Sequence, residues 1–348
     1  MEVHTTTHAS ASTKTSQTRI GGPVFDAVFL GAVVWFQFGG WSDAWAHHHI
    51  PQLETFLTPW HGILYSGFLV TALVLLTAIT INRVRGANWH DAIPAGYALS
   101  LLGIGGFIVG GIGDAIWHTL FGVEQSVDAQ FSPSHLTLLL FGCMFLLGPF
   151  RAVYQRRVET VGSKVFLTIT AILLFLLFNI NTQTYHPLVF LWPTNTPKTD
   201  VEGQLLAVVA IFFQSAIMVG VLLYLIRRWK MYPGFFTIVL TASAIPLTFM
   251  EDHYIGILVA LLGGIVIDGA YALLKPSLTR VLQFRTFAAI SAGGFYLMYI
   301  LVLQLTSGIV WTIHLAGGSV TTSALVGWLL TYLLVPVSLN EEEKTEEA

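Results

Sequence analysis

The chain has 348 residues and a composition that excludes an ordinary soluble domain. Hydrophobic residues make up 54% of it, charged residues make up 10%, and the mean hydropathy is +0.71. The formal net charge of −3, without a basic patch, argues against nucleic acid as a partner. We therefore predict an all-α, polytopic membrane protein that has the lipid bilayer as its surroundings.

Residues 1–21 are rich in Thr, Ser and His and lack an apolar stretch, so we expect a disordered tail and not a cleaved signal. An acidic tail is expected at 339–348. Between the tails, ten apolar segments are long enough, or nearly so, to cross a bilayer. The ninth and tenth are separated by 308–318, which could be a re-entrant or interfacial piece. The predicted segments are 23–42, 60–82, 92–116, 133–154, 164–182, 204–226, 233–250, 254–274, 286–306 and 319–337.

Positive charges follow these segments in a regular way. Of the 16 Lys and Arg residues, Lys198 alone falls in a loop on the predicted outer side. This is a positive-inside pattern, and it predicts that both termini are cytoplasmic. Most of the histidines fall at the opposite, extracytoplasmic end, so we expect any chemistry there, in a plasma-membrane protein.

A six-residue pattern occurs twice in the first four segments. The sequence D-A-x-x-H followed by [ST]-P-x-H begins at Asp43 and again at Asp114, 71 residues later. An internal repeat explains this better than coincidence does. We therefore divide the chain into a four-helix metal-binding unit, 22–155, and a six-helix unit of unknown role, 156–338.

The spacing within the pattern indicates a metal site. Asp114 and His118 are four residues apart, so on a helix they share one face. Ser132 is a good N-cap and Pro133 suits the first helical position, which places His135 at the start of the next helix. Two helix ends would then deliver one Asp and two His to one spot. The predicted metal ligands are Asp114, His118, His135, Asp43, His47 and His61.

The donor types restrict the metal. Cys143 is the single cysteine, so a thiolate cluster is excluded and nitrogen and oxygen must hold the ion. One carboxylate with two imidazoles suits copper, zinc or iron and leaves positions open for water, oxygen or substrate. Three tryptophans are expected to crowd the sites: Trp45, Trp60 and Trp117.

Other polar residues have plainer interpretations. We interpret His48, His49 and His314 as interfacial residues, and 251–253 (Glu-Asp-His) as a solvated turn that could supply a further ligand or a proton relay. Asp268 lies inside an apolar segment and needs a partner. Asn179 or Asn181 could bond to it, or it could belong to a proton path.

The stretch around Asp114 resembles the copper-binding motif of the C-type subunit of the copper membrane monooxygenases, the particulate methane and ammonia monooxygenase group. The resemblance rests on Asp114, Trp117, His118, Asp128, Phe131, Ser132, Pro133, Ser134 and His135. It implies copper bound by Asp114, His118 and His135. It also implies association with other membrane subunits, because the enzymes of this group work as assemblies of three kinds of subunit.

The earlier copy is similar to the second metal site of the same C-type subunit, on Asp43, Trp45, His47, Glu54, Pro59 and His61. Asp43 stands where that site has Asn, the two motifs come in reverse order, and the loop from His118 to His135 is longer. The resemblance covers about residues 40–145.

Two functions of different classes follow. The first is a copper-dependent, oxygen-activating monooxygenase, or a subunit of one, acting on a small apolar substrate. The alternative is a non-enzymatic copper protein that acquires, transports or inserts the metal, alone or as a homo-oligomer. Haem ligation by two histidines is a third interpretation. An enzyme predicts an apolar cavity beside the site, whereas a carrier predicts a polar pathway.

Overall fold

A computed structural model describes residues 19–50, 58–122, 130–155 and 158–335. Within these ranges the chain is all-helical, and nine helices are long and apolar enough to cross a membrane. The chain is therefore a multi-pass membrane protein. The helices are α1 (Gly22–His49), α2 (Pro59–Val84), α3 (Trp89–Ala92), α4 (Ala98–Phe121), α6 (Pro133–Leu146), α7 (Gly148–Tyr154), α8 (Val161–Thr182), η1 (Gln183–Tyr185), α9 (Pro187–Phe190), α10 (Trp192–Asn195), α11 (Val201–Arg228), α12 (Phe235–Thr248), α13 (Ile255–Leu274), α14 (Val281–Thr306) and α15 (Ile313–Leu334).

Three elements differ from the predicted segments. The first helix continues to His49, since nothing before the Ile50-Pro51 pair interrupts it. The segment 233–250 forms α12, which has 14 residues and is short for a full span. The stretch 308–318 turns at Gly308 and begins α15 at Ile313, so this helix starts earlier than the predicted segment 319–337. The predicted tails fall largely outside the described residues.

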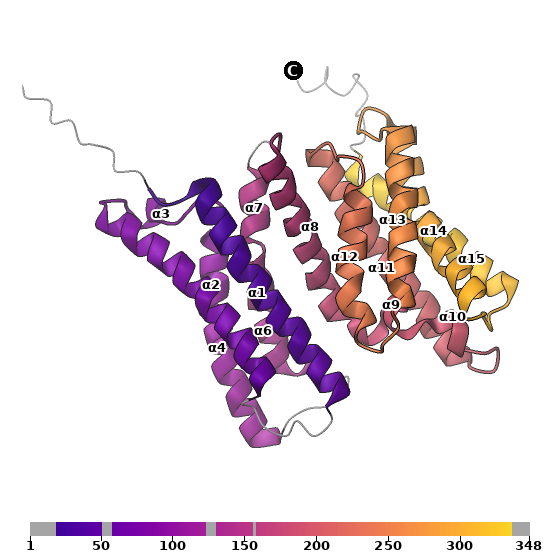
Figure 1. Ribbon diagram of the computed structural model, residues 1–348, viewed down its shortest axis with the longest axis horizontal. Coiled ribbons are helices and arrows are strands. Elements are labelled where there is room, and N and C mark those ends of the chain that lie inside the picture. The colour runs from indigo at the N-terminus through magenta and orange to yellow at the C-terminus, as the bar shows by residue number, and fades with distance from the viewer. Residues whose placement is uncertain (1–18, 51–57, 123–129, 156–157, 336–348) are drawn as a thin grey trace, which may run out of the picture.

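The first half consists of two helical hairpins, α1–α2 and α4–α6 (Figure 1). The two helices of the first hairpin lie so close together that a Cβ on Gly39 would be 2.5 Å from the Leu64 Cα atom. The missing side chain of Gly39 allows this approach. Aromatic rings join the two hairpins, with Phe36 edge-on to Phe107 at 5.4 Å and to Phe145 at 4.8 Å between ring centroids. Close packing of this kind holds helices together in lipid.

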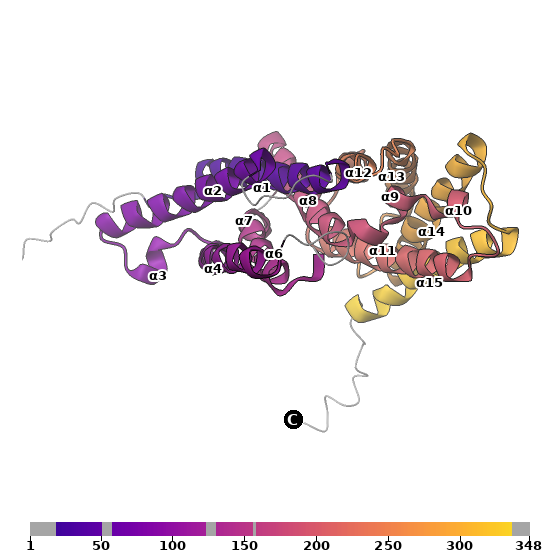
Figure 2. The same ribbon diagram turned by 90° about the horizontal axis from the view of Figure 1, so that it is seen from below.

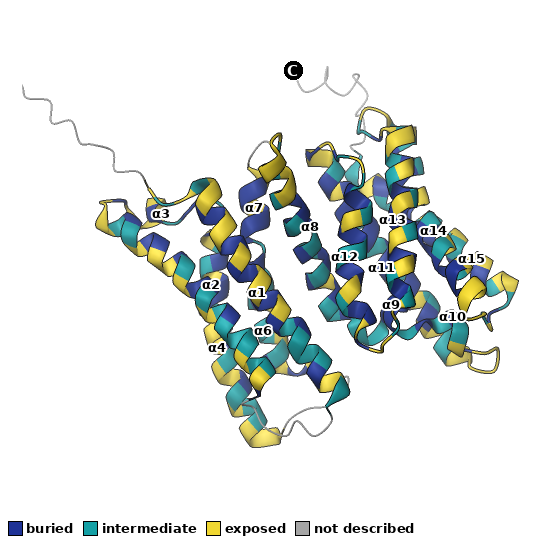
Figure 3. Cartoon of the chain, in the orientation of Figure 1, coloured by how far each residue is buried: buried dark blue, intermediate teal, exposed yellow. Residues whose placement is uncertain are grey.

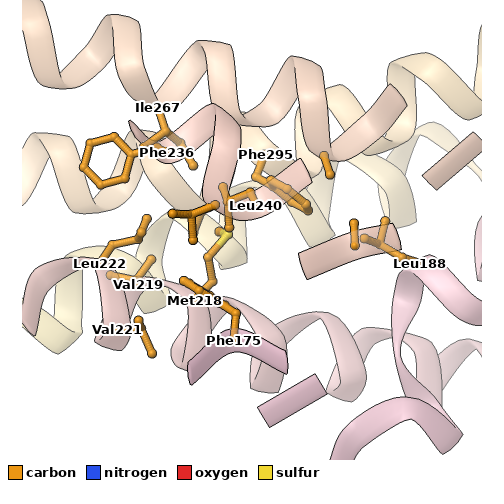
Figure 4. Close-up of a cluster of buried hydrophobic side chains, with 14 of the residues drawn as sticks. Phe175, Leu188, Met218, Val219, Val221, Leu222, Phe236, Leu240, Ile267 and Phe295 are labelled. Carbon is orange, nitrogen blue, oxygen red and sulfur yellow. The ribbon is translucent and has the colours of Figure 1, made fainter. Parts of the chain in front are cut away.

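The second half has a separate core, formed mainly by α8 and α11–α14. Figure 4 shows part of it, where Phe175, Met218, Leu240 and Phe295 converge. Helix α8 lies between the halves in Figure 1 and contributes to both cores, with Leu173 facing the first and Phe175 facing the second. The two D-A-x-x-H motifs lie in the first half. Helix α8 packs against both halves and so sets the position of the first half relative to the second.

Exposed residues lie along the outward faces of the helices (Figure 3), and many of them are large and apolar. Leu273, Leu305 and Leu333 are each more than four-fifths exposed. A soluble monomer rarely shows apolar surface on this scale, whereas lipid tails cover it without cost. Contact with the lipid bilayer follows from this surface.

Asp268 has a bonding partner other than the two asparagines predicted for it. Its carboxylate accepts hydrogen bonds from the backbone N–H of Thr237 at 2.9 Å and from the Thr237 hydroxyl at 2.6 Å. These groups lie in the first turn of α12. The N-cap residue of this helix is Gly234, which has no side chain to accept a backbone N–H. Asp268 therefore caps α12 from α13, and Asn179 and Asn181 bond elsewhere.

Candidate metal centre

The repeated motifs lie at the end of the first half opposite α3, where α1 and α4 end and α2 and α6 begin (Figures 1 and 2). Each motif brings its three predicted ligands together. Asp43, His47 and His61 form one group, and Asp114, His118 and His135 form the other. In each group, one ligand atom per residue lies within 4.8 Å of the others.

Asp114 is the buried member of the second group. Its Oδ1 atom lies 3.5 Å from Nε2 of His118 and 3.4 Å from Nε2 of His135. Two ligands of a tetrahedral ion with bonds of about 2.1 Å are about 3.4 Å apart. The three atoms therefore stand at the spacing of ligands around one ion. Asp114 Oδ1 is buried and accepts no hydrogen bond within the described structure, which leaves it available to a cation.

The hydrogen bond made by the His118 ring indicates which of its nitrogen atoms faces Asp114. Its Nδ1 atom lies 3.2 Å from the carbonyl oxygen of Gly122, and a carbonyl only accepts, so Nδ1 carries the hydrogen. In the neutral ring, Nε2 then presents a lone pair to the Asp114 carboxylate. Two electron-rich atoms face each other, an arrangement that a metal ion between them stabilises.

The first group has a similar geometry with one longer distance. Asp43 Oδ2 lies 3.4 Å from Nε2 of His61 and 3.8 Å from Nε2 of His47. Asp43 and His47 are one turn apart near the end of α1, as the spacing predicts. The equivalence of the two groups supports the internal repeat.

The [ST]-P-x-H half of each motif forms a helix start that also orients the histidine. Ser132 and Thr58 are the N-caps of α6 and α2, and they accept the backbone N–H of His135 and His61. The same hydroxyl oxygens lie 2.9 Å from His135 Nδ1 and 3.1 Å from His61 Nδ1. Each ring is thereby fixed with Nε2 toward its Asp. The sequence predicted the Ser132 cap but not this second contact.

The two groups are neighbours. The Asp43 carboxylate interacts electrostatically with Asp114 and with His135 of the other group. Tyr65, one turn after His61 on α2, interacts with both carboxylates, and its ring lies 6.2 Å from that of His61 between centroids. Tyr65 therefore lies beside both groups. Sequence reasoning did not single it out, although its position four residues after a ligand is a usable signal.

An apolar cavity of about 620 Å³, widely open to the surface of the bundle, lies beside Tyr65, between α2 and α4. Its lining includes Phe68, Phe107, Gly111 and Ala115. Ala115 directly follows the ligand Asp114 in α4. Successive residues of a helix point about 100° apart, so the face of α4 that lines the cavity adjoins the face that carries the ligands. A small apolar molecule in this space would lie next to the centre.

Some residues named in the sequence analysis make contacts within their own helix, and others lie outside the described residues. Trp45 stacks on His49 at 4.6 Å, and Trp117 packs on Phe121 at 4.5 Å between ring centroids. These two rings therefore pack on neighbours in their own helices. Glu54 and Asp128, which belong to the resemblance, lie outside the described residues.

Comparison of the chain with known protein families, with curated proteins and with solved structures finds no match. The likeness to the C-type subunit of the copper membrane monooxygenases therefore rests on the motif residues alone.

Proposed function

We propose that this protein binds copper at the two Asp-His-His groups and acts as an oxygen-activating monooxygenase, or as a subunit of one, on a small apolar substrate. The observation that carries the proposal is the apolar cavity of about 620 Å³ beside the buried Asp114 group. Copper is preferred to iron and zinc because the motifs resemble those of a copper enzyme. The centre would face the extracytoplasmic side of the plasma membrane.

The chain's own residues have distinct roles in this proposal. His118 and His135 supply neutral nitrogen ligands that their backbone and hydroxyl partners orient. Asp114 offsets part of the charge of the ion, and Phe68 and Phe107 line the space in which the apolar substrate would lie. Copper held there would supply the one-electron chemistry that activates dioxygen. The overall reaction places one oxygen atom in the substrate and reduces the other to water, with two electrons and two protons from a reductant.

Metal analysis of the purified full-length protein tests the first part of the proposal. We would load the protein with copper, iron or zinc, remove loosely held metal, and measure bound metal by mass spectrometry. The variants His118→Ala plus His135→Ala and His47→Ala plus His61→Ala should each lose about half of the bound copper. His90→Ala plus His314→Ala is the matched control, because both residues are exposed and remote from the motifs.

Oxygen uptake with ammonia or a small hydrocarbon as substrate tests the second part. Substrate-dependent oxygen consumption by the copper-loaded protein, lost in the His118→Ala plus His135→Ala variant, supports an oxygenase. Bound copper without oxidation, even with added membrane partners, would leave the copper carrier as the function. Equal metal content in the parent and in both double variants would refute the metal centre itself.

A further inference from the structure

Two histidine–carboxylate pairs join the end of α1 to the turn between α12 and α13. His48 Nδ1 lies 3.6 Å from Glu251 Oε1, and His49 Nε2 lies 3.6 Å from Asp252 Oδ2. Both histidines directly follow the ligand His47. Figures 1 and 2 agree in placing the end of α1 beside this turn, so the second half of the chain reaches the rim of the metal centre.

The second pair is held in place on both sides. His49 Nδ1 donates to the carbonyl of Trp45 at 3.0 Å, and the ring stacks on Trp45. Asp252 Oδ1 accepts from the hydroxyl of Tyr254 at 2.6 Å. The remaining atoms, His49 Nε2 and Asp252 Oδ2, face each other at 3.6 Å. That distance suits two ligands of one ion, and the supporting bonds resemble those of the buried histidines.

These pairs differ from the buried centre in their exposure. The side chains of Glu251 and Asp252 are 42% and 61% exposed, whereas those of Asp43 and Asp114, the carboxylates of the two groups, are 15% and 2% exposed. An ion arriving from water therefore meets the turn before it meets Asp114. Each pair offers only two ligands, so an ion held there is held weakly and can leave again. A weakly binding, solvent-exposed pair of ligands next to a less exposed metal group can hold an ion briefly before the ion moves to that group.

We propose that His48, His49, Glu251 and Asp252 form an uptake site that takes a copper(II) ion from solvent and passes it to the Asp43 group through the adjacent His47. This inference rests on the proposed function, because it supplies the ion to that centre. It assigns a role to the 251–252 turn of the second half.

The competing account is a pair of ion pairs between histidinium and carboxylate that only fasten the two halves. Lysine separates the two accounts, since its ammonium pairs with a carboxylate but lacks a lone pair for copper at neutral pH. The variant His48→Lys plus His49→Lys keeps the ion pairs and removes the ligands. Glu251→Gln plus Asp252→Asn removes the charges with little change in shape, and Asn tolerates the positive φ of 55° at position 252.

The experiment measures uptake rate and final content separately. Metal-free full-length protein receives limiting copper(II), a chelator stops uptake at set times, and protein-bound copper is measured. Both variants should fill the two Asp-His-His groups several-fold more slowly than the parent and reach the same final content. His314→Lys is the control, because this exposed residue lies on α15.

Three outcomes would overturn the inference. Parental uptake rates in both variants would refute it while leaving the buried centre intact. Slow uptake in the Gln/Asn variant with parental uptake in the Lys variant would identify the pairs as fasteners. A parent that retains no copper at any time would refute the proposed function, and the uptake site with it.

Discussion

His118 and Gly122 bond to each other in both directions at the end of α4. The Gly122 N–H donates to the His118 carbonyl at 3.0 Å, and His118 Nδ1 donates to the Gly122 carbonyl at 3.2 Å. Gly122 has a φ of +84°, which a residue with a side chain adopts only with strain. One glycine thus ends the helix and orients a predicted metal ligand.

Gly122→Ala should therefore weaken metal binding at the Asp114 group. The strained backbone moves the carbonyl that fixes the His118 ring, and loss of such a supporting contact lowers metal affinity by about 10–100-fold. Competition titration with a copper chelator measures the change. Gly86→Ala is the control, because Gly86 has a similar φ of +88° at the other end of the bundle. Equal loss of affinity in both variants would show that strain alone is responsible.

Asp114→Asn should have opposite effects on the metal-free and metal-loaded protein. The buried Asp114 oxygen faces two imidazole nitrogens without a hydrogen bond, which destabilises the metal-free state. An amide N–H in its place can donate to His118 Nε2, which recovers about 1–3 kcal/mol of folding free energy. Thermal unfolding in detergent, with chelator and with copper, gives both values. The expected result is a higher midpoint without metal and a smaller rise on adding copper than the parent shows, because the Asp43 group still binds copper; a lower midpoint in both conditions would contradict it.

Gly111→Leu should reduce substrate oxidation without changing metal content. A Cβ at this position would meet the Tyr65 ring at 3.6 Å, an ordinary contact, so the added side chain occupies the cavity without breaking the helix pair. The KM for the largest accepted substrate should rise most, and bound copper should equal that of the parent. Gly113→Leu is the control, since nothing lies within 4 Å of its Cβ position. Unchanged kinetics with Gly111→Leu would show that the substrate lies elsewhere.

His186 should make the protein sensitive to acid. Burial lowers the pKa of His186 to about 3, against roughly 6.5 for an unfolded chain. Between pH 6.5 and pH 3 the His186 side chain is protonated in the unfolded chain but not in the folded one. The free energy of unfolding therefore falls as the pH drops below about 6.5. At pH 5 the loss is roughly 2 kcal/mol. Its Nδ1 atom accepts the Leu188 N–H at 3.1 Å, a bond that Asn can replace.

His186→Asn should accordingly lose less stability than the parent between pH 7.5 and pH 5. Thermal midpoints at the two pH values measure this difference, and His90→Asn serves as the exposed control. An unchanged pH dependence would show that other groups dominate the response to acid.

Much of the centre was predictable because its geometry is local. Asp114 and His118 are one helical turn apart, and Ser132 with Pro133 sets where α6 begins, so short-range rules place His135 at a helix start. The same rules failed for Asp268, whose partner Thr237 lies 31 residues away. They also missed the pairing of His49 with Asp252, because nothing near either residue indicates the other.

The sequence by itself determined the helical membrane architecture, the repeat and the six residues that form the two groups, because hydropathy, helical periodicity and capping act over a few residues. The tertiary structure decided that the two groups are neighbours, that Tyr65 and an apolar cavity lie beside them, and that the turn at 251–252 reaches the end of α1. These relationships depend on how helices distant in sequence pack against one another, and that packing depends on side-chain shapes across the whole bundle.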